Sequence, residues 1–263
     1  MTENEVIKFE YKNCFVAFLD ILGFRTKVME TKDSSKNLEM LIEALKISGS
    51  FPSGGKKVSS EKGENRTISV QTRFFSDTMV LFLQEDPRDL SHLFLMTRYL
   101  QDSLWKNGIC LRGAITIGDM YWTDDEKDIT IGPALIEAYQ LESEIAIFPR
   151  IIISEGLNNY IDVRNPSSEP FSQNCQLKNM LRLDSDGTYF LDLLNLHITR
   201  AKDEHLVSNA GTFTIQWTTN SDSNYENIIQ IVDSIIERNR NSKDPKIKQK
   251  YRWLENYRDL VSQ

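Results

Sequence analysis

The sequence predicts a fold of the α+β class, in which strands and helices interleave around one core, and three observations support this prediction. An unbroken apolar run of strand length, Phe15–Leu19, is followed by a glycine turn and the start of a helix. A β-prone segment, Thr67–Leu83, is interrupted only by the small polar pair Ser76-Asp77, which is typical of a hairpin tip. The stretch Asp89–Leu104 then repeats apolar residues at helical spacing.

Composition limits the classes of protein to consider. With 263 residues, 40% hydrophobic, the chain is long enough for one large domain or one domain with an appendage. The formal net charge of -7 argues against nucleic acid as a partner, because general nucleic-acid binding needs a basic face. No apolar run reaches membrane-spanning length, and the cysteines and histidines show no ligand spacing. We therefore expect a cytoplasmic protein with no membrane partner, no zinc site and reduced thiols.

Two acidic residues stand where apolar strands end. Asp20 closes the first strand, and Asp77 lies in the predicted hairpin tip. If these strands are neighbours, the two carboxylates meet at one edge of the sheet and repel each other unless a cation or a proton lies between them. Mg²⁺ favours one or two carboxylates together with the oxygens of a phosphate. The pattern therefore indicates a divalent-metal site, although Asp20 alone could equally be a helix cap or a turn residue.

The middle of the chain continues this alternation. Leu111–Asp119 is strand-like, and Gly132-Pro133 opens a helix to Ser143, with proline at its first position. Residues 48–66 are long, polar and charged, so we expect a solvated loop there, and Asp119–Asp128 is expected to be a turn region. Leu181–Leu194 is expected to be a hairpin, because Asp186-Gly187 lies between two apolar runs.

The C-terminal part differs in character. Asn224–Arg238 and Lys246–Val261 are amphipathic, and Asp244-Pro245 gives the second segment a capped start. Two such helices joined by a short polar loop form a helical hairpin, which we expect to cap the core. We divide the chain accordingly into a catalytic domain, residues 1–205, and an extension with two helices, residues 206–263.

Taken in order, four motifs resemble the catalytic domain of class III nucleotide cyclases. They are FLDILGF from Phe18, FSDTMVLF from Phe75, RGAITIGD from Arg112 and IGPALIEAYQLE from Ile131. The resemblance covers roughly residues 12–155, and its spelling is most similar to bacterial pyrimidine cyclases of Pycsar-type anti-phage defence. It implies a ferredoxin-like βαββαβ cyclase core, with helices on one face of a mixed sheet and the C-terminal helical hairpin added. It also implies a homodimer with sites at the interface.

The resemblance implies a role for each matching position. Two Mg²⁺ or Mn²⁺ ions would be held by Asp20, Asp77 and the backbone carbonyl of Ile21. The phosphates of a nucleoside triphosphate would be held by the backbone amides of Leu22, Gly23 and Phe24. Arg73 takes the place of a base-reading lysine, although it could equally be a strand-surface arginine. Thr130, beside Ile129, lies near the family's other base-reading place.

The sequence departs from the family at the transition-state residues. The family's asparagine and arginine fall on Ile136 and Gln140, neither of which is charged. Arg112, Tyr139 and Arg150 are the candidates to replace them. Arg112 could instead brace its strand, and Tyr139 could be a core residue.

These implications lead to three hypotheses. The first is a metal-dependent cyclase that converts a pyrimidine nucleoside triphosphate, UTP in preference to CTP, to the 3′,5′-cyclic monophosphate and pyrophosphate as an anti-phage defence signal. The second is an adenylate or guanylate cyclase. The third is a catalytically silent module that binds a nucleotide, which the loss of the family's asparagine and arginine favours.

Overall fold

The computed structural model describes residues 10–49, 54–59, 65–123, 129–163, 177–195, 203–209, 212–218 and 222–262. These residues form an α+β fold, which confirms the predicted class. The strands of the large sheet are β1 (Lys12–Ile21), β2 (Gly54–Ser59), β3 (Asn65–Phe75), β4 (Thr78–Gln84), β5 (Leu111–Trp122), β6 (Thr130–Ile131), β7 (Ile151–Ile153), β8 (Leu181–Leu183) and β9 (Tyr189–Leu191). A separate two-stranded sheet consists of β10 (Asp203–Asn209) and β11 (Thr212–Thr218).

Helices occupy the intervals between these strands. They are α1 (Phe24–Glu30), a 3-10 turn (Thr31–Asp33), α2 (Ser35–Gly49), α3 (Leu90–Trp105), α4 (Pro133–Glu144), α5 (Glu155–Val163), α7 (Asp222–Arg240) and α8 (Pro245–Val261). Among the residues with assigned positions, no helix is both long and apolar enough to cross a membrane.

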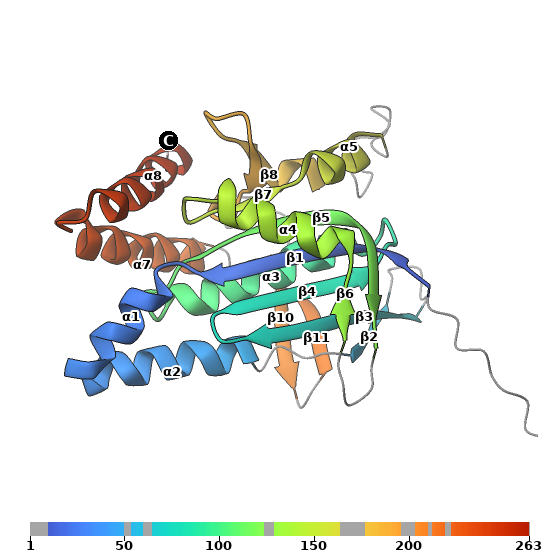
Figure 1. The fold of residues 1–263 in the computed structure, drawn as a ribbon, viewed down its shortest axis with the longest axis horizontal. Coiled ribbons are helices and arrows are strands. Elements are labelled where there is room, and N and C mark those ends of the chain that lie inside the picture. The colour runs from blue at the N-terminus through green and yellow to red at the C-terminus, as the bar shows by residue number, and fades with distance from the viewer. Residues whose placement is uncertain are drawn as a thin grey trace, which may run out of the picture.

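The central strands have the arrangement that the sequence predicts. The sheet order is β2-β3-β4-β1-β5-β7-β9-β8, with β6 paired to β5 (Figure 1). The four strands β3-β4-β1-β5 pair antiparallel and are connected along the chain as βαββαβ, which is the ferredoxin-like core. The parallel pairing of β5 with β7 then makes the sheet mixed.

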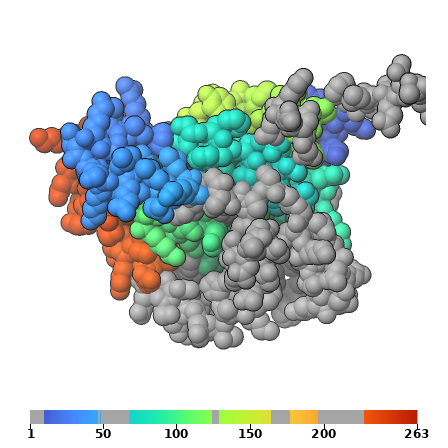
Figure 2. Space-filling model, turned by 90° about the horizontal axis from the view of Figure 1, so that it is seen from below, coloured from blue at the N-terminus to red at the C-terminus, as the bar shows by residue number. Residues whose placement is uncertain are grey.

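The two faces of the sheet are covered unequally. Phe15, Ala17 and Leu19 of β1 belong to the main core, the larger cluster of buried apolar residues, to which α3, α7 and α8 also contribute. Around this core α2 contacts α3, and α3 contacts α7 (Figure 2). The opposite face, which we call the α4 face, is lined by Cys14, Val16, Val80, Phe82, Met120, Ala134 and Ala138. The expectation that helices cover one face only is therefore wrong, because α4 lies across β1 and β5 on the other face (Figure 1).

Two expected loops contain strands. Within the predicted loop 48–66, β2 pairs antiparallel with β3, and hydrogen bonding to that neighbour compensates for its glycine-rich, polar sequence. Within the predicted turn 119–128, β5 continues to Trp122 and pairs with β6, while residues 124–128 lie outside the described residues.

The C-terminal helical hairpin is confirmed. The Asp244 side chain accepts a hydrogen bond of 2.8 Å from the Lys246 N–H, and Pro245 occupies the first turn of α8. Tyr251, Leu254, Tyr257 and Val261 of α8 are buried in the main core, as expected for a capping helix. The division at residue 205 stays a prediction.

Candidate active site

Asp20 and Asp77 lie side by side where β1 ends and the β3–β4 hairpin turns. Asp20 is opposite Thr78 on one side and opposite Arg112 on the other. The Ile21 N–H donates a 3.1 Å hydrogen bond to the Asp77 carbonyl, and Ser76 in the turn has a left-handed φ of 57°. The tight turn therefore brings the second aspartate to the end of the central strand, as the sequence predicts.

Burial and neighbouring charges act on the Asp20 carboxyl together. Its side chain is only 16% exposed. Burial raises the pKa of Asp20, the Arg112 guanidinium opposes that rise, and the Asp77 carboxylate adds to it. The two aspartates are therefore close enough to repel each other, and the pair favours a bound proton or cation.

Arg112 connects Asp20 to a second acid. Its Nε lies 3.1 Å from Asp20 Oδ2, and its Nη2 lies 2.7 Å from Glu142 Oε1. The first contact is a hydrogen bond, whereas Glu142 Oε1 accepts no well-directed hydrogen bond within the described residues, so the second contact is an ion pair. Arg112 therefore does more than brace its strand, since it holds the Asp20 carboxylate.

The next residue, Gly113, explains why the strands can meet so closely here. A Cβ atom on Gly113 would lie 2.4 Å from the Phe18 carbonyl oxygen and 2.8 Å from Leu19 Cδ2. Only glycine fits this approach of β1 to β5, which keeps Arg112 in register with Asp20.

Glu142 is a site residue that the sequence analysis missed. It is 3% exposed and follows Ala134 and Ala138 on the buried stripe of α4, at intervals of four residues. Burial raises the pKa of Glu142 to about 7; Arg112 opposes this rise, and Asp20 and Asp77 add to it. The four-residue spacing from two alanines was the available signal, since it places a carboxylate on a buried face.

Lys250 is a second residue that sequence reasoning missed. It lies on α8 and is half-buried. Burial lowers the pKa of Lys250, Arg112 adds to this effect, and Asp20 opposes it. No local pattern could reveal this placement, because the packing of the C-terminal hairpin brings the residue to the site.

The two aspartates have the chemistry that Mg²⁺ or Mn²⁺ requires. Adjacent carboxylates that repel each other are suitable hard oxygen ligands, and Arg112 contacts only Oδ2 of Asp20. Across the described part of the chain, no group of three or more His, Cys, Asp or Glu side chains could hold a metal ion.

The expected phosphate-binding amides need one correction. The Leu22 N–H donates a 2.9 Å hydrogen bond to the Cys110 carbonyl, so it is already used within the protein. Gly23 precedes α1 with a left-handed φ of 74°, which glycine adopts readily. The amides of Gly23 and Phe24 remain as candidates.

Arg73 and Thr130 lie together on the α4 side of the sheet. Arg73 Nε donates a 3.0 Å hydrogen bond to Thr130 Oγ1, and its Nη2 donates one of 3.3 Å to the Thr123 carbonyl. Arg73 is 6% exposed, so the alternative of a strand-surface arginine is wrong. Ile129 beside Thr130 is exposed.

Ile136 and Gln140, which stand where class III cyclases have asparagine and arginine, lie on the exposed side of α4. Ile136 is 59% exposed and Tyr139 is 54% exposed, and Gln140 is exposed as well. Tyr139 contacts the Phe18 ring edge to face, with ring centroids 5.6 Å apart. Tyr139 is therefore not a core residue.

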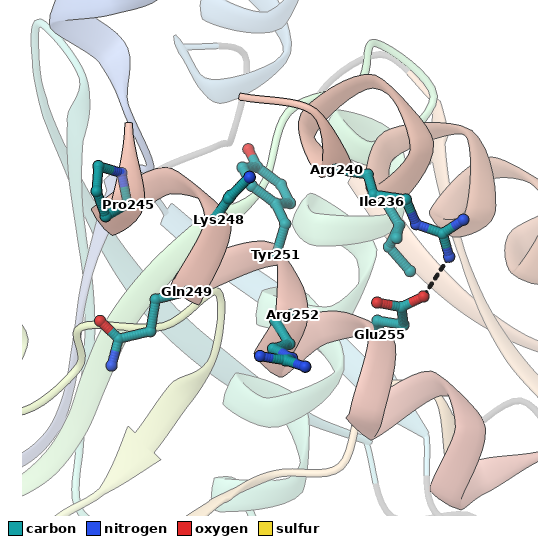
Figure 3. A pocket seen from close by; sticks show the side chains of 8 residues that line it. All are labelled: Ile236, Arg240, Pro245, Lys248, Gln249, Tyr251, Arg252 and Glu255. Atoms are coloured by element: carbon teal, nitrogen blue, oxygen red, sulfur yellow. Dashed lines mark hydrogen bonds and ion pairs between the residues drawn. The ribbon is translucent and has the colours of Figure 1, made fainter. Parts of the chain in front are cut away.

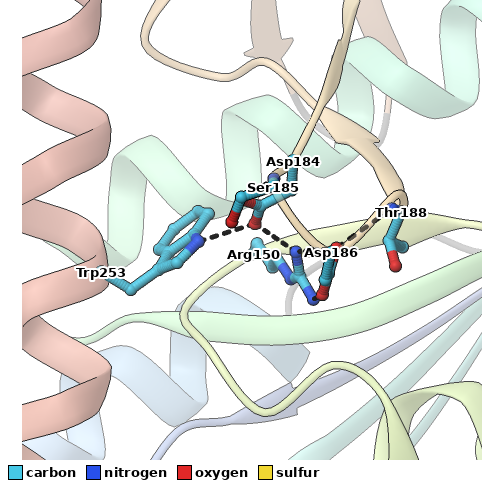
Figure 4. Close-up of polar contacts among 6 residues, drawn as sticks. All are labelled: Arg150, Asp184, Ser185, Asp186, Thr188 and Trp253. Carbon is cyan, nitrogen blue, oxygen red and sulfur yellow. Dashed lines mark hydrogen bonds and ion pairs between the residues drawn. The ribbon is translucent and has the colours of Figure 1, made fainter.

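Arg150 has a different function from the one considered for it. It is 2% exposed, and its guanidinium contacts the carboxylates of Asp184 and Asp186 at the tip of the β8–β9 hairpin (Figure 4). Trp253 of α8 donates a 2.7 Å hydrogen bond to the same Asp184 carboxylate. Arg150 therefore ties the hairpin and α8 together, and it is not available as a transition-state residue.

A groove of about 470 Å³ lies between α7 and α8 (Figure 3). Its lining includes Arg240, Lys248, Tyr251 and Arg252. None of the residues discussed as candidates for the active site lines this groove.

No known protein-family model matches the sequence, and no curated protein matches it. Solved structures do match. One is the guanylyl cyclase domain of the RhoGC fusion protein from Blastocladiella emersonii, with 17% identity, a TM-score of 0.39, and coverage of 69% of this chain and 95% of that one. Another is an adenylate/guanylate cyclase/hydrolase from Silicibacter pomeroyi, with 18% identity, a TM-score of 0.32, and coverage of 69% and 95%.

A third match is a class III adenylyl cyclase-like ATP-binding protein from Pseudomonas aeruginosa, with 12% identity and a TM-score of 0.42. It covers 71% of this chain and 40% of that one. All three TM-scores lie below 0.5, so we base the function on the residues of the site and not on these matches.

Proposed function

We propose that this protein is a metal-dependent nucleotide cyclase, which converts a nucleoside triphosphate to its 3′,5′-cyclic monophosphate and pyrophosphate. The observation that carries the proposal is the pair of adjacent carboxylates, Asp20 and Asp77, at the end of the central strand. The motifs around both residues are those that resemble class III cyclases. Arg112 forms an ion pair with Asp20 and holds that carboxylate beside Asp77.

The proposed reaction is an intramolecular phosphoryl transfer. The ribose 3′-oxygen forms a bond to the α-phosphorus, the bond from that phosphorus to pyrophosphate breaks, and the hydroxyl proton leaves to solvent. Such a reaction depends mainly on positioning and on charge neutralisation. Asp20, Asp77 and the Ile21 carbonyl would hold the two Mg²⁺ or Mn²⁺ ions, which when bound neutralise charge on the attacking and leaving oxygens.

The remaining residues orient the substrate. The amides of Gly23 and Phe24 would bind the outer phosphates, and Arg112 fixes the Asp20 carboxylate. Tyr139, exposed beside Phe18, stands where it could contact the nucleotide. Each of these roles is part of the proposal.

We propose UTP as the substrate, with CTP second. Arg73 and Thr130 are hydrogen-bonded to each other at the place where the family reads the base, and the choice of a pyrimidine rests on the similarity of the motifs. The use of the product as an anti-phage defence signal rests on the similarity of the motifs to Pycsar-type cyclases.

We also propose that the protein forms a homodimer with its sites at the interface. Ile131, Ile136 and Tyr139 are each more than half exposed, near the candidate site. Large apolar side chains that gather at the surface are characteristic of association surfaces.

A second candidate function is a silent nucleotide-binding module. Ile136 and Gln140 carry no charge where the family has a transition-state pair, which is the observation that favours it. A purine-specific adenylate or guanylate cyclase is the alternative within the same chemistry.

One experiment separates these functions. The protein is incubated with each of the four ribonucleoside triphosphates and Mn²⁺ or Mg²⁺, and products are identified by chromatography and mass spectrometry. We expect cyclic UMP, or cyclic CMP, from the wild type and none from Asp20→Asn. Cyclic AMP or cyclic GMP would establish the purine alternative. Nucleotide binding without any product would establish the silent module and overturn the proposed activity.

A further inference from the structure

We propose that α8 completes the candidate site within its own chain by supplying Lys250 as a cation that contacts the phosphate oxygens of the substrate. This inference rests on the proposed function and deepens it. It assigns a positively charged residue to a site in which this chain has Ile136 and Gln140, both uncharged, where the family has asparagine and arginine.

The packing of α8 on two sides fixes where Lys250 lies. Tyr251 is buried, which raises the pKa of its hydroxyl, and Cys110, directly before β5, and Glu30, at the end of α1, add to that rise. Trp253 stacks on Phe148, in the turn that follows α4, with ring centroids 5.8 Å apart and an interplanar angle of 7°. Lys250, which precedes Tyr251, is thereby placed between the start of β5 and the end of α4.

These two places carry Arg112 and Glu142. The charges of Arg112 and Asp20 both act on the Lys250 ammonium, and Lys250 in turn acts on Glu142. Lys250 therefore lies close enough to these groups for their charges to interact. Within the residues that the structure describes, the Lys250 ammonium makes no ion pair and donates no hydrogen bond.

Among the described residues, the Lys250 ammonium has no carboxylate in ion-pair contact, which leaves it for an anionic ligand. Arg112 is already shared between Asp20 and Glu142. Lys250 is half-buried on a flexible four-carbon stem and is not yet engaged, which suits a lysine that acts as a point charge on phosphate. The polyphosphate of a nucleotide is the ligand that the candidate site would bring within reach.

The helix that carries Lys250 is firmly held, as a substrate-binding element should be. Trp253 is hydrogen-bonded to Asp184, and the Tyr257 hydroxyl donates a 2.6 Å hydrogen bond to Asp192. The same hydroxyl accepts a 2.9 Å hydrogen bond from the Leu194 N–H. These contacts fix α8 against the β8–β9 region on the side away from its capped start.

The test compares Lys250→Gln and Lys250→Arg with the matched control Lys248→Gln. Lys248 lies about 200° around the same helix, is exposed and lines the α7–α8 groove (Figure 3). Binding of inorganic tripolyphosphate in the presence of Mn²⁺ is measured by calorimetry. The rate of cyclic nucleotide formation is measured in parallel. Thermal melting checks that each variant is folded.

We expect Lys250→Gln to weaken tripolyphosphate binding and to lower kcat/KM by about 10- to 100-fold each, the range for a lost charge-assisted hydrogen bond. Lys250→Arg should retain most of both, and Lys248→Gln should match the wild type. Equal binding by Lys250→Gln and the wild type would overturn the inference, as would an equal loss in Lys248→Gln. A wild type that does not bind tripolyphosphate also overturns it. If the wild type binds tripolyphosphate but makes no cyclic nucleotide, the proposed activity fails and the Lys250 comparison still decides the inference.

Discussion

The two faces of the central sheet are built from the same strands but serve different ends. Along β1 the odd-numbered residues, such as Phe15 and Leu19, enter the main core, whereas Cys14 and Val16 enter the α4 face. Side chains alternate along a strand, so Asp20 shares the α4 face with Val16. This difference indicates that the main core provides most of the stability, whereas the α4 face carries the polar residues of the candidate site.

The largest effect should come from breaking the polar side of this comparison. Asp77→Asn removes a proposed metal ligand while keeping the size of the side chain, so we expect at least about 100-fold slower cyclisation. Stability should be unchanged or slightly higher, because a repulsion with Asp20 disappears. The measurements are product formation and thermal melting, and a variant with wild-type turnover would refute the site.

A matched pair of buried phenylalanines tests the two faces for stability. Phe15 lies in the main core and Phe82 on the α4 face, and both are fully buried. We expect Phe15→Ala to cost about 4–5 kcal/mol and Phe82→Ala about 3 kcal/mol, because the smaller cluster can collapse more easily around the vacated space. Denaturant unfolding of both variants measures the difference, and equal costs would contradict the proposed division of labour.

The pH dependence of stability should report on Glu142. Its pKa in the folded protein is raised to about 7, so the native state binds this proton more tightly than the unfolded chain does. The group therefore contributes stability that is fully present below pH 4.5 and is lost as the pH rises through about 7. Glu142→Gln lacks this change and should gain about 3 kcal/mol relative to the wild type over that interval.

Denaturant unfolding at several pH values between 4 and 8 measures this difference. Glu144→Gln is the matched control, since Glu144 is exposed on the same helix. A Glu142→Gln protein whose stability runs parallel to that of the wild type would show that the Glu142 carboxyl has an ordinary affinity for its proton.

The smallest expected effect on the fold comes from the surface of α4. Ile136→Glu should leave stability within about 0.5 kcal/mol of the wild type, because the side chain is 59% exposed in one subunit. It should nevertheless shift the proposed dimer towards monomer. Light scattering after gel filtration measures this shift. Leu38→Glu on α2 is the control, and an unchanged oligomeric state in both variants would contradict an interface at α4.

The parts of the fold that the sequence predicted well depend on local patterns. The apolar run Phe15–Leu19, the Asp186-Gly187 turn and the Asp244-Pro245 start all appear in the structure where expected. The missed elements lack such a pattern. β2 is polar and rich in glycine, and α5 buries only Leu157 and Ile161.

The same distinction applies to the candidate site. Asp20 and Asp77 were predictable neighbours because each follows a strand-like run with its own turn. Glu142 was visible in principle through its spacing from Ala134 and Ala138. Lys250 was not, because only the packing of Tyr251 and Trp253 brings it near Arg112.

The ion pairs of Arg150 with Asp184 and Asp186 have a consequence for purification. The guanidinium is 2% exposed, and ions in solution screen such an enclosed contact far less than a surface pair like Lys46 with Glu43. Washing with concentrated salt, which is used to remove bound nucleotides during purification, should therefore leave α8 in place. Loss of activity after such a wash would then reflect departed small molecules and not a displaced helix.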